Sequence, residues 1–254
     1  MKLTFLGTGT SQGVPVITCR CPVCTSADPH DQRLRTSALV TADSGDNILI
    51  DIGPDFRTQM LREDVSHIEG ILVTHAHRDH VAGLDDVRAF NYQQNCRMNL
   101  YANDVAIDIL HRDYAYMFEY HPYPGAPQVD LHLVGDQPFR IGAQSVVPIR
   151  AMHLHMPILG YRLDGLTYIT DASKIETQEL DKVKGTKVLV INALRKEKHF
   201  SHFCLSEALQ VVEIVRPERT YLTHMSHDFG LHAVEQLQLP SNVYMAYDGL
   251  TIDI

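Results

Sequence analysis

The sequence predicts an α/β protein, a sandwich of layers built from many strands and separate helices. Short runs rich in apolar and β-branched residues recur along the chain, and segments with helical spacing separate some of them. No short-period repeat, low-complexity tract or clear linker divides the 254 residues. Large β-rich enzymes often reach this length undivided, so we predict one domain over residues 1–254.

The expected strands are rich in Val, Ile, Leu, Thr and Tyr, and Gly, Asp or Asn bounds many of them. Because such residues fit a pleated and half-buried surface, these runs predict strands. The runs are Leu3–Leu6, Ser37–Thr41, Ile48–Ile52, Gly70–Thr74, Asn99–Tyr101, Ser145–Ile149, Leu159–Leu163, Thr167–Thr170, Lys187–Asn192, Thr220–Thr223, Asn242–Tyr247 and Leu250–Ile254.

Three segments have the pattern of helices. Apolar residues recur at helical spacing in His80–Tyr92, and Asp104–Phe118 is expected to be helical too. The third segment, Ser206–Val215, has a serine at the expected N-cap and Pro217 just beyond its end.

Composition and charge limit the classes of function. A formal net charge of −9 argues against a large nucleic-acid footprint, but bound cations could still attract a small phosphate substrate. No stretch approaches the roughly 20 apolar residues of a membrane helix, and no membrane partner is expected. The first residues read as an alternating strand that runs into glycines, without the features of a signal peptide, so the expected compartment is the cytoplasm.

The first functional signal is a cluster of histidines between an apolar strand and a helical segment. The sequence Thr74-His75-Ala76-His77-Arg78-Asp79-His80 can direct two imidazoles at one ion and an Asp–His pair at a neighbouring ion. Imidazole and carboxylate are the ligands expected for Zn, Mn or Fe. A solvated histidine-rich turn is the alternative, and the H-x-H-x-D-H pattern directly after a buried strand argues against it.

This turn resembles the signature of the metallo-β-lactamase superfamily, and the resemblance extends across nearly the whole chain. It implies the αββα sandwich of that superfamily, with two mixed β-sheets flanked by helices. It also implies that Asp51, at the end of an upstream strand, orients a ligand histidine through its other ring nitrogen.

The same resemblance implies a complete set of ligands for two divalent ions, Mn or Zn. The ligands that follow the histidine turn along the chain are expected at or just after strands. His153 is expected to be one of them, and His155 is the alternative to it. Carried over residue by residue, one ion would be held by His75, His77 and His153, and the other by Asp79, His80 and His224, with Asp171 between them.

A second metal site is predicted from the cysteines. Cys19, Cys21 and Cys24 form a C-x-C-x-x-C run, whereas Cys96 and Cys204 lie elsewhere, so the five cysteines make no disulfide framework. Tetrahedral structural zinc needs four ligands, and His227 is the best candidate for the fourth. Three free thiols in a loop are the alternative.

The glycine-rich start at Gly7–Pro15, the cysteine loop and the H-x-x-H pair near the C-terminus together resemble the PhnP-type phosphodiesterases of the carbon–phosphorus lyase pathway. These enzymes are related to the tRNA 3′-processing ribonucleases. The resemblance implies hydrolysis of small cyclic ribose or nucleotide phosphodiesters through a metal-bridging hydroxide, with Mn or Zn at the dinuclear site and one structural Zn.

Two catalytic residues follow from that resemblance. His202 lies in the loop Ser201–Ser206, which matches the loop of an extra catalytic histidine, and would protonate the leaving oxygen or stabilise the charged phosphorane; His199 is the alternative. Asp79 would help to hold the nucleophile as a ligand that can accept its proton.

Two features depart from the PhnP pattern. The stretch from His153 to Gly160 is one residue longer, and the Tyr- and Pro-rich segment Tyr114–Pro127 does not align. That segment either covers the site or packs as a surface loop. Both departures bear on the substrate more than on the class of reaction.

Two other functions compete with the phosphodiesterase. A tRNA 3′-processing endoribonuclease would share all the dinuclear ligands, but the charge of −9 and the lack of an inserted basic arm argue against a stable nucleic-acid complex. A non-catalytic metal-binding protein is the alternative of another class, and the complete ligand set argues against it. Related enzymes are often dimers, so a homodimer is a further prediction.

Overall fold

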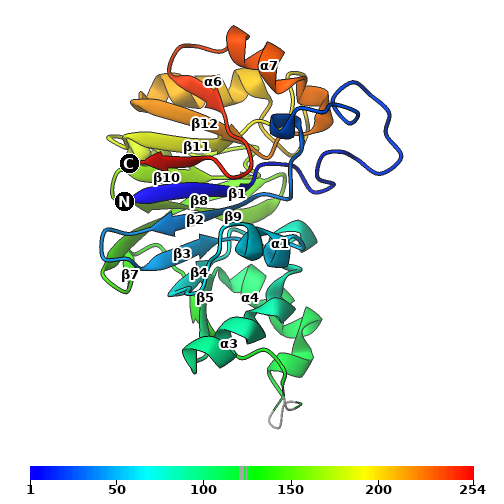
Figure 1. Cartoon of the computed structure of the whole chain (residues 1–254). Coiled ribbons are helices and arrows are strands. Elements are labelled where there is room, and N and C mark those ends of the chain that lie inside the picture. Colours follow the sequence, from blue (N-terminus) through cyan, green and yellow to red (C-terminus); the bar gives the residue numbers. More distant parts are fainter. Residues whose placement is uncertain (120–122, 124) are drawn as a thin grey trace.

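The computed structural model describes residues 1–119, 123 and 125–254, and its strands form two seven-stranded sheets (Figure 1). The first sheet has the strand order β14-β1-β2-β3-β4-β5-β6, and the second has the order β13-β12-β11-β10-β9-β8-β7. The strands are β1 Lys2–Gly7, β2 Ser37–Thr41, β3 Asn47–Ile50, β4 Gly70–Leu72, β5 Met98–Ala102, β6 Val129–Leu133, β7 Phe139–Ile141, β8 Gln144–His153, β9 Met156–Leu163, β10 Leu166–Ile169, β11 Val188–Asn192, β12 Arg219–Thr223, β13 Val243–Met245 and β14 Thr251–Asp253.

Each sheet is antiparallel along one half and parallel along the other. In the first sheet the pairs from β14 to β3 are antiparallel, and β3, β4, β5 and β6 pair in parallel. In the second sheet the pairs from β7 to β10 are antiparallel, and β10, β11, β12 and β13 pair in parallel. Both sheets are therefore mixed, as the sequence predicts.

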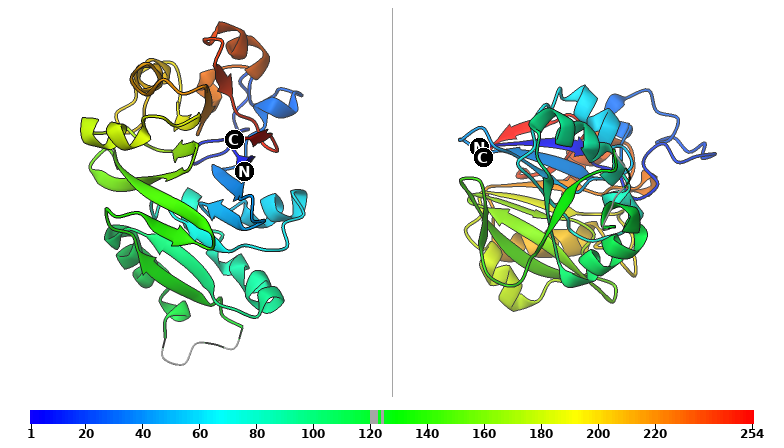
Figure 2. Two further views of the ribbon diagram at one scale, coloured as in Figure 1. Left: turned by 90° about the vertical axis from the view of Figure 1, so that its left-hand side faces the viewer. Right: turned by 90° about the horizontal axis from the view of Figure 1, so that it is seen from below.

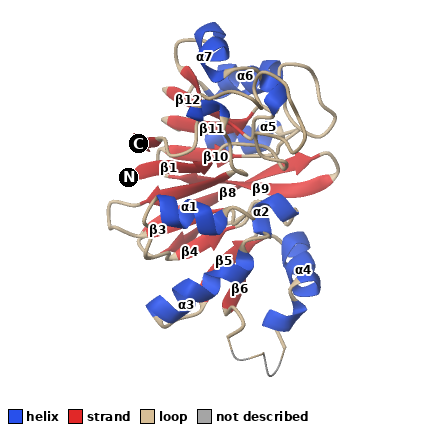
Figure 3. Ribbon diagram, turned by 45° about the vertical axis from the view of Figure 1, so that its right-hand side comes forward, coloured by secondary structure: helices blue, strands red, loops and turns tan. Residues whose placement is uncertain are grey.

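Helices cover the outer face of each sheet, and the two inner faces pack on each other (Figure 3). The helices are α1 Phe56–Arg62, α2 Arg78–Val81, α3 Arg88–Gln94, α4 Asp104–Asp113, α5 Thr177–Val183, α6 Leu205–Val215 and α7 His232–Glu235. Residues of α1, α3 and α4 share one core with the first sheet, and residues of α5 and α6 share another with the second sheet. The predicted αββα sandwich is confirmed.

The core between the sheets contains residues of β1 and of the second sheet. Leu3 and Phe5 of β1 pack in the same buried cluster as Tyr168 of β10 and Val190 of β11. β14 pairs with β1, so the N- and C-termini lie side by side (Figure 2).

One predicted helix is wrong in its extent. The segment His80–Tyr92 is not continuous, because α2 ends at Val81 and a 3₁₀ turn over Leu84–Val87 precedes α3. Gly83 causes the break: its N–H donates to the Ile52 carbonyl at 2.9 Å, and a Cβ there would lie 2.3 Å from the Gly53 carbonyl oxygen. Gly83 therefore packs closely against the backbone that follows Asp51, and this tertiary contact interrupts the helix that the sequence pattern predicts.

The other two helices differ only at their ends. α4 ends at Asp113, and a 3₁₀ turn over Ala115–Met117 takes the place of its predicted last turn. The N-cap of α6 is Cys204 rather than Ser206, because the Glu207 carboxylate reaches back to accept from the Cys204 N–H at 3.0 Å.

The sequence pattern missed two strands, β6 and β7, and underestimated β8, which runs on to His153. β6 lies at the edge of the first sheet with a mostly half-exposed face, so it lacks the apolar run of a central strand. The predicted excursion Tyr114–Pro127 includes residues 120–122 and 124, which lie outside the described residues, and its role as a cover stays a prediction.

No helix in the described part of the chain is both long and apolar enough to cross a membrane.

Candidate metal centre

Four of the predicted site residues lie just beyond the carboxyl ends of strands that pair in parallel. Asp51 follows β3, His75 lies three residues beyond β4, Asp171 lies two residues beyond β10 and His224 follows β12. Ligand sites of open α/β sheets occur at this edge, because parallel strands direct their following loops to one side. Asp51, Asp171 and His224 have left-handed backbone conformations, with φ of 61°, 60° and 56°. Such conformations in non-glycine residues cluster at functional sites.

The first group of candidate ligands consists of His75, His77 and His153. Their ligand atoms lie within 4.8 Å of one another, and His75 Nε2 lies 3.0 Å from His77 Nδ1. His153 Nδ1 donates to the Ser201 carbonyl at 2.8 Å, so in the neutral imidazole the other ring nitrogen is the one that can bind a cation. Three imidazoles converging in this way could hold one cation.

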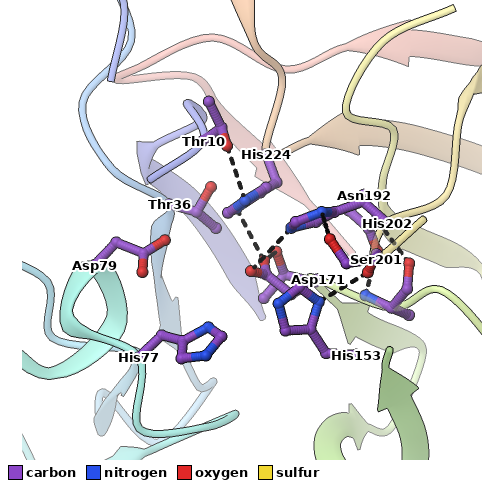
Figure 4. A network of polar contacts seen from close by, with 12 residues as sticks. Thr10, Thr36, His77, Asp79, His153, Asp171, Asn192, Ser201, His202 and His224 are labelled. Carbon is purple, nitrogen blue, oxygen red and sulfur yellow. Dashed lines mark hydrogen bonds and ion pairs between the residues drawn. The ribbon is translucent and has the colours of Figure 1, made fainter. Parts of the chain in front are cut away.

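The second group consists of Asp79, His80, Asp171 and His224, again within 4.8 Å of one another. His80 Nε2 lies 3.1 Å from Asp79 Oδ2 and 3.2 Å from Asp171 Oδ2. His224 Nδ1 lies 2.9 Å from Asp171 Oδ1 (Figure 4). Because Asp171 Oδ2 is also 3.7 Å from His75 Nε2, its carboxylate lies between the two groups.

The residues present fit a divalent metal ion. Among the described side chains, His80 Nε2 and His224 Nδ1 are buried ring nitrogens without a hydrogen-bond partner, and both face Asp171. A buried polar atom without a partner is costly, and a cation would satisfy both nitrogens at once. Nitrogen and carboxylate oxygen are donors that Zn and Mn accept.

Asp51 holds the His80 ring in position. Its carboxylate accepts from the Thr74 N–H and the Thr74 hydroxyl, each at 2.8 Å, and from His80 Nδ1 at 2.6 Å. With Nδ1 engaged in this way, Nε2 is turned toward Asp171 and Asp79. A carboxylate that orients a ligand histidine also raises its basicity.

At two of the candidate ligands, His75 and Asp171, the surroundings favour the protonation state that binds a cation. Burial, together with the nearby His80, holds the pKa of His75 well below its ordinary value, so this imidazole is neutral. Burial alone would raise the pKa of Asp171, but His224 and His80 outweigh it and lower that pKa well below the usual range. The centre thus offers a neutral imidazole and an ionised carboxylate.

His202 lies beside this centre. Its Nε2 is 3.5 Å from Asp171 Oδ2, and its Nδ1 is 2.9 Å from the Ser201 hydroxyl oxygen. The alternative, His199, contacts the His202 ring from the other side, with the two Nδ1 atoms 3.3 Å apart. His202 is therefore placed to act on a bound group, with His199 behind it.

The remaining predicted residue at this site, His155, is exposed at the turn between β8 and β9 and belongs to none of the ligand groups. Two neighbours were not found from the sequence. The Thr10 hydroxyl lies 3.2 Å from His224 Nε2, and the Ser201 carbonyl fixes His153. Thr10 lies 214 residues before His224, and a backbone carbonyl leaves no signal in the sequence.

The cysteine loop forms a separate group of four donors. The Sγ atoms of Cys19, Cys21 and Cys24 lie 3.4, 3.3 and 3.5 Å from His227 Nδ1. The Cys24 N–H, which donates to Cys21 Sγ at 3.4 Å, is the main cause that lowers the pKa of the Cys21 thiol to about 6. Three thiols and one imidazole make the donor set of a structural zinc site.

Comparison with known proteins assigns the chain to one family. A family model described as the Beta-lactamase superfamily domain matches residues 46–225. A crystal structure of a diphosphatase from the PhnP family has 38% sequence identity and a TM-score of 0.92, covering 100% of this chain and 97% of that one. Zn²⁺-bound PqqB from Methylobacterium extorquens has a TM-score of 0.81 at 18% identity over the full length of both chains, which shows a shared fold.

A curated relative, the octanoyltransferase of Porphyromonas gingivalis, is 38% identical over 252 residues. The match covers 98% of this chain but 51% of the relative, so the chain spans about half the length of that protein.

Proposed function

Because the chain belongs to the PhnP family of the metallo-β-lactamase superfamily, we propose that it is a metal-dependent phosphodiesterase acting on small cyclic ribose or nucleotide phosphodiesters. One observation carries the proposal. Six candidate ligands from distant parts of the chain gather around a seventh, Asp171. A further histidine, His202, is not among the predicted ligands and faces the same carboxylate.

We propose that His75, His77 and His153 hold one divalent ion, Mn or Zn, that Asp79, His80 and His224 hold the other, and that Asp171 contacts both. Two such ions, when bound, supply an activated water nucleophile and neutralise charge on phosphate oxygens. The four-donor cysteine group would hold one structural Zn.

Asp79 would orient the attacking water by accepting a hydrogen bond from it. Although burial raises the pKa of this carboxyl, His80 outweighs that effect and lowers the pKa below its usual range. Asp79 is therefore ionised near neutral pH, and it serves better as a hydrogen-bond acceptor than as a strong base.

His202 would donate a proton to the leaving oxygen. An alkoxide is a poor leaving group, so a positioned acid adjacent to it accelerates bond cleavage. The Ser201 hydroxyl and the carboxylate of Asp171 hold the two ring nitrogens of His202, and the side chain is 13% exposed, which leaves an edge open to a substrate.

A second candidate is the hydrolysis of a diphosphate bond. The PhnP-family protein with 38% identity is described as a diphosphatase. A phosphate leaving group needs less help from an acid than an alkoxide does, so this reaction would depend less on His202. Octanoyl transfer is not proposed, because that name describes a protein of which this chain matches only about half.

An assay with bis(p-nitrophenyl) phosphate and added Mn²⁺ or Zn²⁺ tests the proposal, followed by cyclic nucleotides, cyclic ribose phosphates, a diphosphate diester and a pre-tRNA. We expect turnover of small diesters that His77→Ala abolishes. Preferred cleavage of the diphosphate would favour the second candidate, and preferred cleavage of pre-tRNA would favour the endoribonuclease. Bound metal without turnover of any substrate would contradict the enzyme and favour a metal-binding protein.

A further inference from the structure

A cavity of about 300 Å³ opens directly onto the candidate metal centre. Two of the candidate ligands, His77 and His153, form one wall of the cavity. Three apolar side chains form an apolar wall of the same cavity: Leu154 from the β8–β9 turn, Met156 from the start of β9 and Phe200 from the loop before α6. A substituent on a phosphate held at the centre would therefore enter this cavity.

The apolar wall is unusually open to solvent. The side chain of Phe200 is 74% exposed, and that of Leu154 is 44% exposed. Exposed large apolar side chains that gather beside a polar centre are typical of a ligand site rather than of a packed core. His155, which is exposed at the rim of the same cavity, adds a group that can donate or accept a hydrogen bond.

Phe200 is held in place although it is exposed. Its ring lies against the His199 ring, with centroids 4.4 Å apart and an interplanar angle of 31°. The next residue, Ser201, is fixed because its carbonyl accepts from His153 Nδ1 at 2.8 Å. Phe200 thus presents a flat apolar face at a defined position near His202, the proposed acid for the leaving oxygen.

We propose that this cavity, defined by Leu154, Met156 and Phe200, binds the nucleobase of a nucleotide diester and that Phe200 is its stacking platform. The inference rests on the proposed phosphodiesterase function and deepens it by naming the substrate class. A flat aromatic ring on a fixed loop matches the π-face of a base, and such stacking tolerates different bases. The imidazole of His155 at the rim can then contact the polar edge of the base.

The test compares two substrates that share the reacting ring. A 2′,3′-cyclic nucleotide carries a base, whereas methyl ribofuranoside 2,3-cyclic phosphate does not. We expect the wild-type protein to prefer the nucleotide in kcat/KM. In Phe200→Ala this preference should fall about tenfold, within the range of stacking energies measured by alanine substitution. Phe200→Tyr should keep the preference, and Tyr92→Ala, which removes an aromatic ring that is 73% exposed on α3, should leave it unchanged.

Equal efficiency on both substrates in the wild type would overturn the nucleobase site while leaving the phosphodiesterase intact. An unchanged preference in Phe200→Ala would also overturn it. If Phe200→Leu kept the full preference, apolar contact rather than stacking would be responsible, and the proposal would be wrong.

A binding readout separates this inference from the proposed activity. Ligand-observed NMR with AMP and the Zn²⁺-loaded protein should show saturation transfer to the base protons, and Phe200→Ala should remove it. If neither cyclic substrate is hydrolysed but the base protons are saturated, the proposed function fails and the nucleobase site stands. If the wild type shows no transfer to the base protons, the site is overturned.

Discussion

The two clusters of candidate metal ligands are built in opposite ways. In the centre around Asp171, the side chains follow the ends of strands in both sheets, and those of His75, His80 and His224 are at most 1% exposed. The cysteine group lies on a loop between β1 and β2 without strand structure, and its three cysteines are only partly buried. His227 lies three residues beyond His224 and so connects this group to the centre along the chain.

This difference indicates what determines the positions of the ligands in each group. The backbone positions of the ligands of the centre are set by strand pairing and by residues with left-handed conformations, such as Asp51. The cysteine loop has few such constraints, so a bound ion would contribute to the folding free energy itself. Changes in the centre should therefore affect mainly catalysis, and changes in the cysteine group mainly stability.

The largest effect should come from Asp171→Asn. This change removes the carboxylate charge that lies between the two groups of histidines, and we expect kcat/KM to fall by roughly a thousandfold, equivalent to about 4 kcal/mol of transition-state stabilisation. Steady-state kinetics with added Mn²⁺ measure it. Asp130→Asn, at a half-exposed carboxylate paired with Arg97, is the matched control. Full activity in Asp171→Asn would show that the group around Asp171 is not the catalytic centre.

Cys21→Ala should lower the melting temperature. Structural zinc supplies about 10–16 kcal/mol of apparent binding free energy, and losing even 3 kcal/mol of stability lowers Tm by about 6–12 °C in a chain of this size. Cys96→Ala, which removes an exposed thiol outside the group, should leave Tm unchanged by calorimetry. Equal Tm values for the two variants would show that the cysteine loop needs no metal.

His202→Ala tests which histidine of the centre, His202 or His199, donates the proton to the leaving oxygen. Loss of a general acid costs about 10²–10⁴-fold with a poor leaving group, so hydrolysis of an alkyl diester should fall by about a hundredfold or more. A p-nitrophenyl ester should be much less affected because its leaving group needs no proton. His199→Ala is the comparison. A larger loss in His199→Ala than in His202→Ala would reverse the assignment.

The last effect concerns stability as a function of pH and comes from Asp248, which connects the two ends of the chain by accepting from the Thr8 hydroxyl at 2.8 Å and the Leu34 N–H at 2.7 Å. Burial raises the pKa of this carboxyl to about 6. Between pH 4 and pH 6 the folded state thus keeps a proton that the unfolded chain has lost, and the resulting stability is lost as the pH rises through 6.

Asp248→Asn stays neutral and lacks this dependence. Its unfolding free energy relative to the wild type should rise by up to about 3 kcal/mol from pH 4 to pH 7. Urea unfolding at the two pH values measures the change. A relative stability that is the same at both values would show that Asp248 is ionised throughout.

The sequence predicted the parts of the fold that local pattern controls. Central strands such as β4 and β11 are buried throughout and mostly apolar, so their pattern predicts them, whereas the pattern of β6 at a sheet edge does not. The helix over His80–Tyr92 was wrong because the close approach of Gly83 to Gly53 is a tertiary contact, which periodicity within one segment cannot show.

The same limit applies to the site. The H-x-H-x-D-H turn identifies itself locally, but His153, Asp171 and His224 were placed only through family resemblance, since 149 positions separate His75 from His224 along the chain (224 − 75). The supporting contacts of Thr10 and of the Ser201 carbonyl depend on the packing of loops from different sheets. The apolar wall at Phe200 depends on the same packing, and no spacing in the sequence indicates it.

We propose that seven side chains bind two cations and that a separate structural zinc lies at the cysteine group. Anomalous diffraction from crystals grown with Zn²⁺ or Mn²⁺, recorded at the metal absorption edges, tests it most directly. We predict one peak among His75, His77 and His153, a second among Asp79, His80 and His224 with Asp171 contacting both, and a third at the cysteine group. Crystals fully loaded with metal that show no peak next to Asp171, or that place His153 or Asp171 far from His75, would contradict the account.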